Sequence, residues 1–356
     1  MYPFTEGSFA VRNGWYVAAF AQDVQRSLLS RWILNEPVVL YRTEAGEAVA
    51  VAGRCPHRHF PLGQSRLSGD EIICGYHGIT FGPDGLCTRV PSQQTVPGVY
   101  KIRKYPLVER GLWLWIWPGD PALADEALLP NLQETGFHDP RFRFQPYYTH
   151  EIAGRYQLLN DNLLDLTHLA VLHRSSIGVE ENASIPEERE EAPGVLRSRR
   201  RMQGVEQTPG SKLVSGYEGV VDRVTGMDFY LPGFHAGLDD THVPRDHPTR
   251  GGEALRLARV FHAVTPGLKN TTHYFFAMGG NMTDEQFAFS KEFLKSVIDE
   301  DIFATVEIEK MLVNLGHSPA ELMLRSDTGA VRARRLLQAM MDKERAASTA
   351  VQPAGP

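Results

Sequence analysis

Two segments decide the fold of the first part of this chain: Cys55-Pro56-His57 and Cys74-Gly75-Tyr76-His77. Each combines one cysteine with one histidine, and residues 58–73 separate them. Thiolates and imidazoles on paired loops bind either zinc or a [2Fe–2S] cluster. Structural zinc sites usually pair Cys with Cys and His with His at intervals of roughly two to four residues. The mixed pairing therefore argues against zinc.

The mixed pairing is what a Rieske cluster requires. One iron takes both thiolates, the other takes both imidazoles, and each loop has to reach both irons. Glycines and prolines that suit tight loops flank the segments: Pro56, Pro61, Gly63, Gly75 and Gly78. The spacing therefore predicts a [2Fe–2S] cluster, and the alternatives are a structural zinc site or four unrelated buried residues. The predicted ligands are Cys55, His57, Cys74 and His77.

Two further residues near these loops need an interpretation. His59 lies at the next alternate position after His57 and is a competing ligand in principle, but we interpret it as a partly exposed loop histidine. Cys87 has no partner at metal-ligand spacing, so we interpret it as a small buried hydrophobe.

The cluster segments lie within a strand-rich region that extends to about residue 118. Runs of β-branched or aromatic residues, separated by Gly, Pro and Asp, occur at 38–41, 48–52, 72–73 and 112–117. This pattern predicts a small all-β domain over residues 1–125. The proline-rich segment after Trp117 is typical of a linker, because proline neither continues a helix nor donates to a sheet.

The remainder predicts an α+β domain over residues 126–345. Residues 156–173 have helical spacing, and 255–264 and 271–278 are expected to be strands around a turn at Pro266-Gly267. The charge-rich segment 180–201 is expected to be a surface excursion. Thr283 and Gln286 have the spacing of a capping box, which predicts the start of a long helix. Residues from Met311 onward are expected to be helical, before a disordered polar tail over 346–356.

The helical segment 156–173 carries a second candidate metal site. Asn162, Asp165 and His168 are three residues apart and would share a helix face. His168 and His173 are five residues apart, about 140° around an ideal helix, so the helix has to loosen or end between them. Two imidazoles suit Fe(II) if a carboxylate completes a facial triad and leaves positions open for dioxygen.

The periodicity of the long helix after Thr283 predicts the carboxylate. An apolar stripe steps by three and four residues through Leu294, Val297, Asp301, Ala304 and Ile308. Asp301 interrupts this buried face, whereas Asp299 is expected to be solvated and Glu300 to be intermediate. An unpaired buried carboxylate is costly, so a metal would explain Asp301. The alternative is an ion pair with an arginine among residues 332–335.

Composition and charge exclude several classes of protein. With 356 residues and 42% hydrophobic and 22% charged residues, the chain is typical of globular proteins. Lys and Arg number 37 against 43 Asp and Glu, so no surplus of cations favours nucleic acid. The most apolar stretch, 112–117, is far shorter than the roughly 18 residues of a membrane helix. Three cysteines and no signal-peptide pattern predict a cytoplasmic protein.

These residues resemble the Rieske non-haem iron aromatic oxygenases, in particular the branch of the vanillate O-demethylase oxygenase component and dicamba monooxygenase. The similarity is nearly full length. It includes segments 13–18, 54–58, 74–78 and 161–168, then Thr265-Pro266 with 272–275, and finally Glu300-Asp301. His59 departs from the family, in which a small residue is common at that position.

The resemblance implies an N-terminal Rieske [2Fe–2S] domain and a C-terminal helix-grip (START-like) catalytic domain, with an antiparallel sheet and a long C-terminal helix. It implies a head-to-tail homotrimer. The implied ligands of a mononuclear Fe(II) are His168, His173 and Asp301. Asp165 would bridge electrons from the neighbouring subunit's cluster to His168, and Asn162 would lie beside the iron. The Asp165 carboxylate is also expected to accept the second N–H of His168.

We therefore expect a terminal oxygenase that activates O2 and oxidises an aromatic substrate, an aromatic acid in particular. No flavin or nicotinamide motif is present, so electrons would come from a separate NAD(P)H-dependent reductase or a ferredoxin. O-demethylation or another monooxygenation is the expected reaction. A ring-hydroxylating or diaryl-ether-cleaving dioxygenase is one alternative, and an electron carrier without catalytic iron is another.

Overall fold

The structure is a computed structural model that describes residues 3–317 and 319–351. The chain divides into two compact units, of which one comprises Ala10–Leu129 with Thr265–Lys269. The other comprises Met1–Phe9, Pro130–Val264 and Asn270–Pro356. The division thus falls between Leu129 and Pro130, whereas the sequence placed it at residues 125/126. We call the first the cluster unit and the second the catalytic unit.

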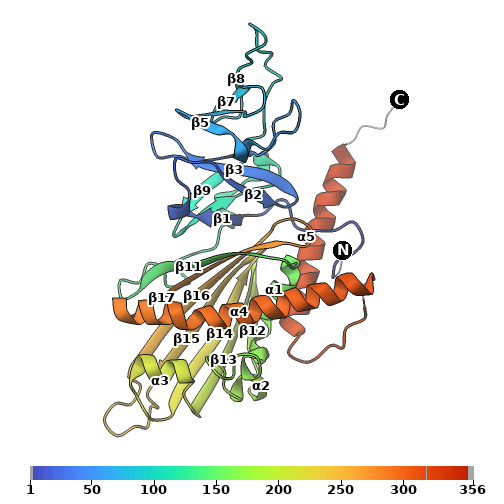
Figure 1. The fold of residues 1–356 in the computed structure, drawn as a ribbon. Coiled ribbons are helices and arrows are strands. Elements are labelled where there is room, and N and C mark those ends of the chain that lie inside the picture. Colours follow the sequence, from blue (N-terminus) through green and yellow to red (C-terminus); the bar gives the residue numbers. More distant parts are fainter. Residues whose placement is uncertain (1–2, 318, 352–356) are drawn as a thin grey trace. The chain divides into compact units, whose positions relative to one another are not determined.

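The cluster unit is all-β, as predicted (Figure 1). Its strands form the sheets β1-β10-β9, β2-β3-β4 and β5-β6-β7-β8, with antiparallel neighbours throughout. The first strands are β1 (Tyr16–Phe20), β2 (Leu29–Ile33), β3 (Glu36–Arg42), β4 (Ala48–Ala52) and β5 (Arg66–Ser68). The others are β6 (Glu71–Ile73), β7 (Thr80–Phe81), β8 (Cys87–Arg89), β9 (Leu107–Arg110) and β10 (Trp113–Ile116). The four predicted strands correspond to β3, β4, β6 and β10.

The core of the cluster unit explains why these short strands hold together. Val39, Tyr41 and Val51 from β3 and β4 pack with Ile72 of β6, and all four side chains are fully or almost fully buried. β-Branched and aromatic residues suit a half-buried pleated surface, which is where they lie. Both cluster-loop cysteines, Cys55 and Cys74, belong to the same core cluster. The core therefore anchors one end of each loop.

The catalytic unit is built on a seven-stranded sheet with the order β11-β17-β16-β15-β14-β13-β12. The strands are β11 (Arg143–Ile152), β12 (Glu188–Ala192), β13 (Val195–Val205), β14 (Val221–Tyr230), β15 (Phe234–His242), β16 (Ala254–Pro266) and β17 (Thr272–Gly280). The pairs β11/β17, β12/β13, β13/β14, β14/β15 and β15/β16 are antiparallel. The strands predicted at 255–264 and 271–278 correspond to β16 and β17.

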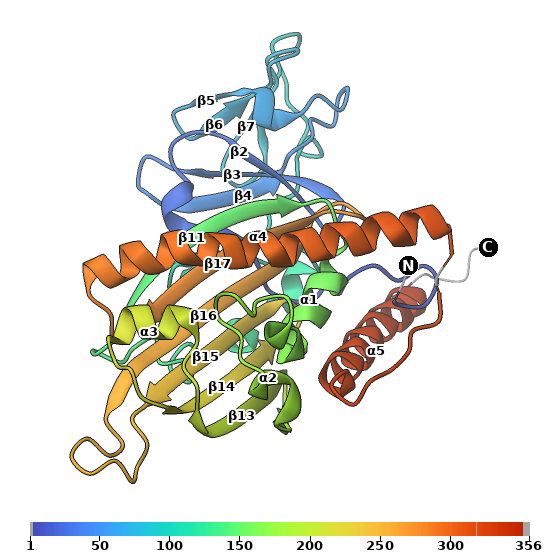
Figure 2. The same ribbon diagram turned by 60° about the horizontal axis from the view of Figure 1, so that its bottom comes forward.

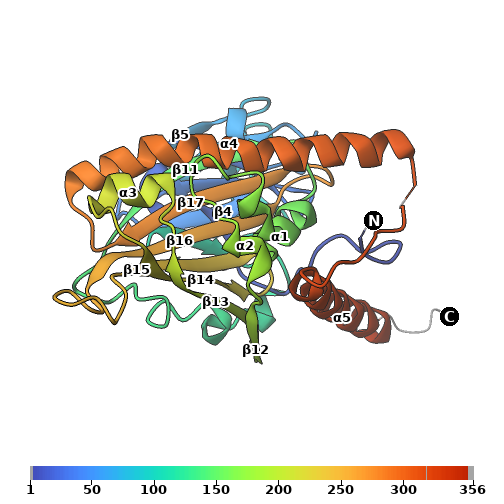
Figure 3. The ribbon, with the colours of Figure 1, turned by 90° about the horizontal axis from the view of Figure 1, so that it is seen from below.

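Helices cover one face of this sheet. The α-helices are α1 (Tyr156–Leu164), α2 (Glu181–Ser184), α3 (Pro209–Ser215), α4 (Asp284–Leu315) and α5 (Thr328–Val351). The long helix α4 crosses the sheet on the same side as α1, α2 and α3, which is a helix-grip arrangement (Figures 2 and 3). The predicted capping box starts α4: the Thr283 hydroxyl accepts from the Gln286 N–H at 3.3 Å, and the Gln286 amide oxygen accepts from the Thr283 N–H at 2.9 Å.

Three predictions about the catalytic unit were wrong in detail. Segment 180–201 contains α2, β12 and most of β13 rather than a surface excursion. Strand β12 is at the edge of the sheet, where charged side chains are tolerated, and β13 pairs with both β12 and β14. The helix predicted from Met311 is interrupted: α4 ends at Leu315, with Gly316 at φ 68°, and α5 starts at Thr328. Helix α5 continues to Val351, so no disordered tail starts at 346; residues 352–356 lie outside the described residues.

Within the described ranges, no helix has the length and hydropathy needed to cross a membrane.

Candidate metal centres and catalytic pocket

The two cluster loops share one backbone pattern. In the first loop, the Cys55 carbonyl accepts a hydrogen bond from the His59 N–H at 3.0 Å. In the second loop, the Cys74 carbonyl accepts one from the Gly78 N–H at 3.0 Å. His59 and Gly78 therefore occupy equivalent positions, and both have positive φ, 59° and 70°. Histidine is among the residues that adopt this region at modest cost, so His59 closes the turn.

The side chain of His59 has a partner within its own loop. Arg54 donates from Nη1 to Nδ1 of His59 at 2.7 Å, and both residues are exposed. These contacts agree with a loop histidine. Cys87 is half-buried on β8 and packs against the core of the cluster unit, where burial raises the pKa of its thiol. Its contacts agree with a small hydrophobic residue.

The donor set of the cluster loops fits a [2Fe–2S] cluster. Cys55 and Cys74 are buried, with 2% and 3% exposure, and neither forms a disulfide. His57 and His77 are exposed, and their ring centroids lie 4.6 Å apart. Burial raises the pKa of the Cys55 thiol, and the adjacent Cys74 raises it further. An inner pair of sulfurs with an outer pair of imidazoles matches two irons, one held by thiolates and one by histidines.

In the catalytic unit, a break after α1 positions the first histidine of the second site. Asp165 adopts an extended conformation (φ −125°, ψ 91°) between α1 and a 3-10 helix, η5 (Leu166–Ala170). Its carboxylate accepts the Thr167 N–H at 3.0 Å and so caps η5. Its backbone carbonyl accepts the Nδ1–H of His168 at 2.6 Å. The sequence argument assigned this second bond to the Asp165 carboxylate, which was wrong because the carboxylate is committed to the cap.

The second histidine follows the end of η5. We predicted that the helix would loosen or end between His168 and His173, and this is confirmed because η5 ends at Ala170. The shared helix face predicted for Asn162, Asp165 and His168 does not form, since Asp165 lies outside α1. The His173 side chain is 1% exposed, and its two nitrogens face two neighbouring carboxylates of α4.

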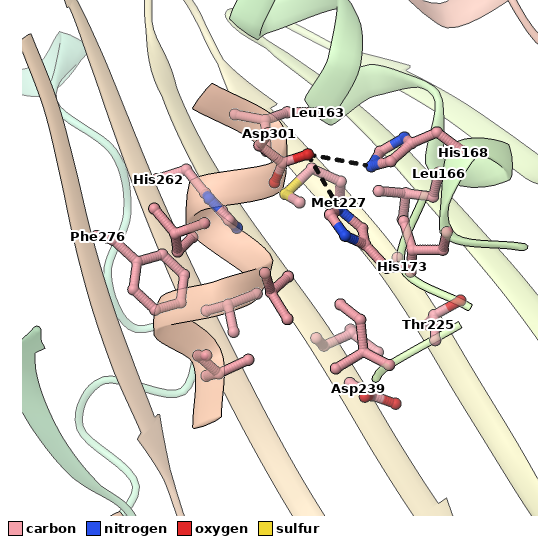
Figure 4. A pocket seen from close by; sticks show the side chains of 18 of the residues that line it. Leu163, Leu166, His168, His173, Thr225, Met227, Asp239, His262, Phe276 and Asp301 are labelled. Atoms are coloured by element: carbon pink, nitrogen blue, oxygen red, sulfur yellow. Dashed lines mark hydrogen bonds and ion pairs between the residues drawn. The ribbon is translucent and has the colours of Figure 1, made fainter. Parts of the chain in front are cut away.

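Asp301 brings the three candidate iron ligands together (Figure 4). Its Oδ1 lies 3.0 Å from Nε2 of His173 and 3.6 Å from Nε2 of His168. Asn162 donates from Nδ2 to the same oxygen at 3.1 Å. One ligand atom from each of the three residues lies within 4.8 Å of the others. The residues that the sequence singled out for this site therefore do meet.

The hydrogen bonds of the two imidazoles explain why this site fits a cation. Nδ1 of His173 lies 2.6 Å from Oε2 of Glu300 and donates to it. Nδ1 of His168 donates to the backbone carbonyl of Asp165, because a carbonyl oxygen can only accept. In the neutral rings, both Nε2 lone pairs then face the Asp301 carboxylate, an arrangement that a positive ion stabilises. Two imidazoles and one carboxylate are the donor set of the facial triad for Fe(II).

The two histidines have opposite pKa shifts. Burial lowers the pKa of His168, and the charge of Asp301 only partly offsets this. Burial would also lower the pKa of His173, but its hydrogen bonds and attraction to Asp301 and Glu300 raise it overall. Without a metal, His173 is thus the ring that a proton favours.

The predicted stripe on α4 was correct as far as Asp301 and wrong beyond it. Ala304 is half-buried and Ile308 is 49% exposed, while Thr305 and Glu309 are buried instead. The stripe drifts because the buried partners of the last turns are polar: Glu309 pairs with the buried Arg155 at 2.6 Å. Asp299 is half-exposed and pairs with Lys295, as expected for a solvated residue.

The alternative from the sequence, an ion pair between Asp301 and an arginine among residues 332–335, was wrong. In the described residues, the ion pairs of Asp301 are with His168 and His173. Arg332 pairs with Glu191, and Arg334 pairs with Asp161 and Glu321. Glu300 was missed as a functional residue, since its position beside Asp301 gives no periodic signal. Its hydrogen bond to His173 becomes visible only in three dimensions.

A cavity of about 110 Å³ adjoins the triad, and His168, His173 and Asp301 line it. An engineered apolar cavity of about 150 Å³ holds one benzene, so the scale is that of a single aromatic ring. Most of the other walls are apolar, including Leu163, Leu166, Met227, Val260, Phe276 and Leu294. His262 also lines the cavity, and its Nδ1 lies 2.6 Å from the Tyr274 hydroxyl. Burial lowers the pKa of His262 to about 4, so it is neutral near pH 7.

A Rieske-type loop pair joined in one chain to a metal triad in a helix-grip domain defines the class of Rieske oxygenase components. The family models agree. Residues 14–106 match the Rieske [2Fe-2S] domain, and residues 152–343 match the vanillate O-demethylase oxygenase C-terminal domain. The chain belongs to the vanillate O-demethylase oxygenase family, and it is an oxidoreductase with a Rieske cluster and a non-haem iron site.

Several relatives match over almost their whole length. The iron–sulfur subunit of the toluene-4-sulfonate monooxygenase system of Comamonas testosteroni is 33% identical, over 94% of this chain and 98% of the relative. The oxygenase component of dicamba O-demethylase from Stenotrophomonas maltophilia is 31% identical, over 94% of this chain and 99% of the relative. The vanillate O-demethylase oxygenase subunit of a Pseudomonas species is 31% identical, over 95% of this chain and 97% of the relative.

Solved structures of dicamba monooxygenase have the same fold. The complex with dicamba superposes with a TM-score of 0.83 at 29% identity, covering 95% of this chain and 100% of the other. The form with non-haem iron and dicamba has a TM-score of 0.76 at 29% identity, covering 95% of this chain and 99% of the other.

Proposed function

We propose that this chain is the terminal oxygenase of a system that oxidises an aromatic acid, by O-demethylation or another monooxygenation. The observation that carries the proposal is the triad His168, His173 and Asp301 at the wall of an apolar cavity of single-ring size. Vanillate and dicamba, named for two relatives, are substrates of O-demethylases, and toluene-4-sulfonate, named for a third, is the substrate of a monooxygenase. A Rieske electron carrier without catalytic iron would not require the triad.

The proposed ligands follow from the two donor sets. The cluster would be held by Cys55, His57, Cys74 and His77. The iron would be held by His168, His173 and Asp301. When bound, the iron would supply the position at which dioxygen is activated, and the cluster would supply electrons singly.

The residues of the chain itself orient this chemistry. Glu300 and the Asp165 carbonyl hold the two imidazole rings by their outer nitrogens, so that Nε2 of each faces the same point. Asn162 also holds the Asp301 carboxylate, because it donates to Oδ1, the oxygen that faces both histidines. The apolar walls would exclude water and hold an aromatic ring beside the triad. The ring itself would not ligate the metal.

For an aryl methyl ether, the balance is simple. The ether, O2, two electrons and two protons give a hydroxymethyl ether and water, and the hydroxymethyl ether collapses to a phenol and formaldehyde. The sequence contains no flavin or nicotinamide motif, so the electrons would come from a separate NAD(P)H-dependent reductase or a ferredoxin. The three free cysteines suit the cytoplasm, where we place the protein.

We also propose a homotrimer with head-to-tail contacts, in which the cluster of one subunit serves the triad of the next through Asp165. Helix α4 and the segment after it expose large apolar side chains that a partner subunit would cover: Phe303, Ile308, Met311, Val313, Leu322 and Leu324.

Product analysis tests the proposed function. The iron-loaded protein, a surrogate ferredoxin with its reductase, NADH and a panel of methoxybenzoates should release formaldehyde in proportion to oxygen consumed. Dihydrodiols without formaldehyde would favour the dioxygenase alternative. If fully loaded protein gave no oxygenated product at all with aromatic acids that carry methoxy or methyl groups, the proposal would be contradicted.

A further inference from the structure

The cavity beside the triad has a charged end. Arg223, Asp239 and Arg256 line it, and they come from the neighbouring strands β14, β15 and β16. Arg223 is opposite Thr241, which is in turn opposite Arg256. Residues opposite each other in an antiparallel sheet point to the same face, so both arginines lie on the face that carries the cavity. Figure 4 shows Asp239 and Thr225 among the lining side chains.

One carboxylate serves both arginines. Arg223 donates from Nε and Nη2 to the two oxygens of Asp239, at 2.7 and 3.0 Å. Arg256 donates from Nη1 to Oδ2 of Asp239 at 2.9 Å. Burial alone would raise the pKa of Asp239, but the two guanidinium groups hold it well below its ordinary value. Two cations and one anion leave one positive charge unmatched within this trio.

Two donors at this end lack partners. Nη1 of Arg223 and Oγ1 of Thr225 are buried, and neither has a hydrogen-bond partner in the described part of the chain. The two residues are 4% and 3% exposed, and their spacing on β14 places them on one face of the strand. A buried donor without an acceptor is costly, and more so when it is charged. Both atoms therefore call for an acceptor from outside the chain.

We propose that Arg223 and Thr225, together with the unmatched charge of Arg256, bind the anionic group of the aromatic substrate; this rests on the proposed function and deepens it. A carboxylate or a sulfonate offers acceptor oxygens to both unpartnered donors, and its charge neutralises the trio. With the anion held there, the apolar walls enclose the ring and the far substituent faces the triad. A neutral amide satisfies the donors but leaves the charge unmatched, so the site selects anions.

Arg256→Gln is the most informative variant. It removes the surplus charge but leaves the two-bond pair between Arg223 and Asp239 in place. Dissociation constants of the iron-loaded wild type and variant are measured by calorimetry for benzoate, benzenesulfonate and benzamide. We expect wild type to bind the anions at least about tenfold more tightly than benzamide, and Arg256→Gln to lose about tenfold for the anions only. The two anions show which group fits better.

Two further variants complete the test. Thr225→Val removes one unpartnered donor at nearly constant shape and should weaken binding of the anions several-fold, whether or not Arg256→Gln folds. Arg259→Gln removes a cation from the same strand but from the opposite face, where it pairs with Asp240, and should leave all three constants unchanged.

The outcomes separate this inference from the proposed function. Equal affinity of wild type for benzoate and benzamide, or an equal loss for both in Arg256→Gln, would overturn the anion site even if turnover proceeds. Selective anion binding without any oxygenated product would support the anion site and contradict the proposed function.

Discussion

Glu300 accepts the Nδ1 hydrogen of His173 at 2.6 Å, while Asp301, the next residue of α4, faces Nε2 of the same ring at 3.0 Å. Two consecutive residues of one helix thus contact the two nitrogens of a single imidazole. Their roles differ, since Asp301 shares the candidate iron position with His168, whereas Glu300 only orients the ring.

We expect Glu300→Gln to weaken Fe(II) binding by about 10- to 100-fold, because the glutamine holds the ring less firmly and makes it a weaker ligand. Chelator competition measures the affinity. The cluster spectrum should not change. Asp299→Asn is the matched control, because Asp299 pairs with Lys295 at the surface. Wild-type affinity in Glu300→Gln would show that the contact does not support the metal.

Cys74→Ser should abolish the red-brown colour and the rhombic EPR signal of the reduced cluster, because the buried thiolate is a proposed ligand. His59→Ala should keep both, since His59 contacts Arg54 and only closes the turn. A colourless wild-type protein that contains zinc would refute the cluster assignment.

Asp165→Asn should retain both metal centres, because an amide oxygen can still cap η5 and the backbone carbonyl still holds His168. If the carboxylate bridges electrons between subunits, a chemically reduced cluster should fail to discharge when oxygen and substrate are added. Stopped-flow absorbance follows the discharge. A wild-type rate in a single turnover would exclude the bridging role.

Asp239→Asn should destabilise the protein by about 3 kcal/mol or more near neutral pH, because it leaves two cations without their carboxylate. The folded pKa of Asp239 is lowered, so its contribution is complete above the unfolded pKa of about 3.9 and is lost as pH falls through the folded pKa. Denaturant unfolding should therefore show a constant difference between wild type and variant from about pH 8 to pH 5. A difference that already declines across this range would contradict the lowered pKa.

Local patterns in the sequence were sufficient for much of this architecture. The C-x-H and C-x-x-H spacing located the cluster loops, and the capping box at Thr283 located the start of α4. Both signals depend only on residues close together in the chain. The position of Asp301 on a buried stripe was also correct, since helix periodicity holds over the two turns before it.

Contacts between distant segments were not predictable in the same way. The buried pair of Glu309 with Arg155 moved the buried face of α4 away from Ile308, and no pattern within the helix encodes a partner so distant in sequence. The charged segment 180–201 became sheet because β14 pairs with β13, again a distant contact. The unpartnered Nη1 of Arg223 likewise appears only when the sheet is assembled.

The central claim is that His168, His173 and Asp301 hold an iron separate from the cluster, and iron and acid-labile sulfide counts test it most directly. Reconstituted wild type should contain about three irons and about two sulfides per chain, and Asp301→Ala about two of each with an unchanged cluster spectrum. Two irons in the fully reconstituted wild type, or three in Asp301→Ala, would contradict the account.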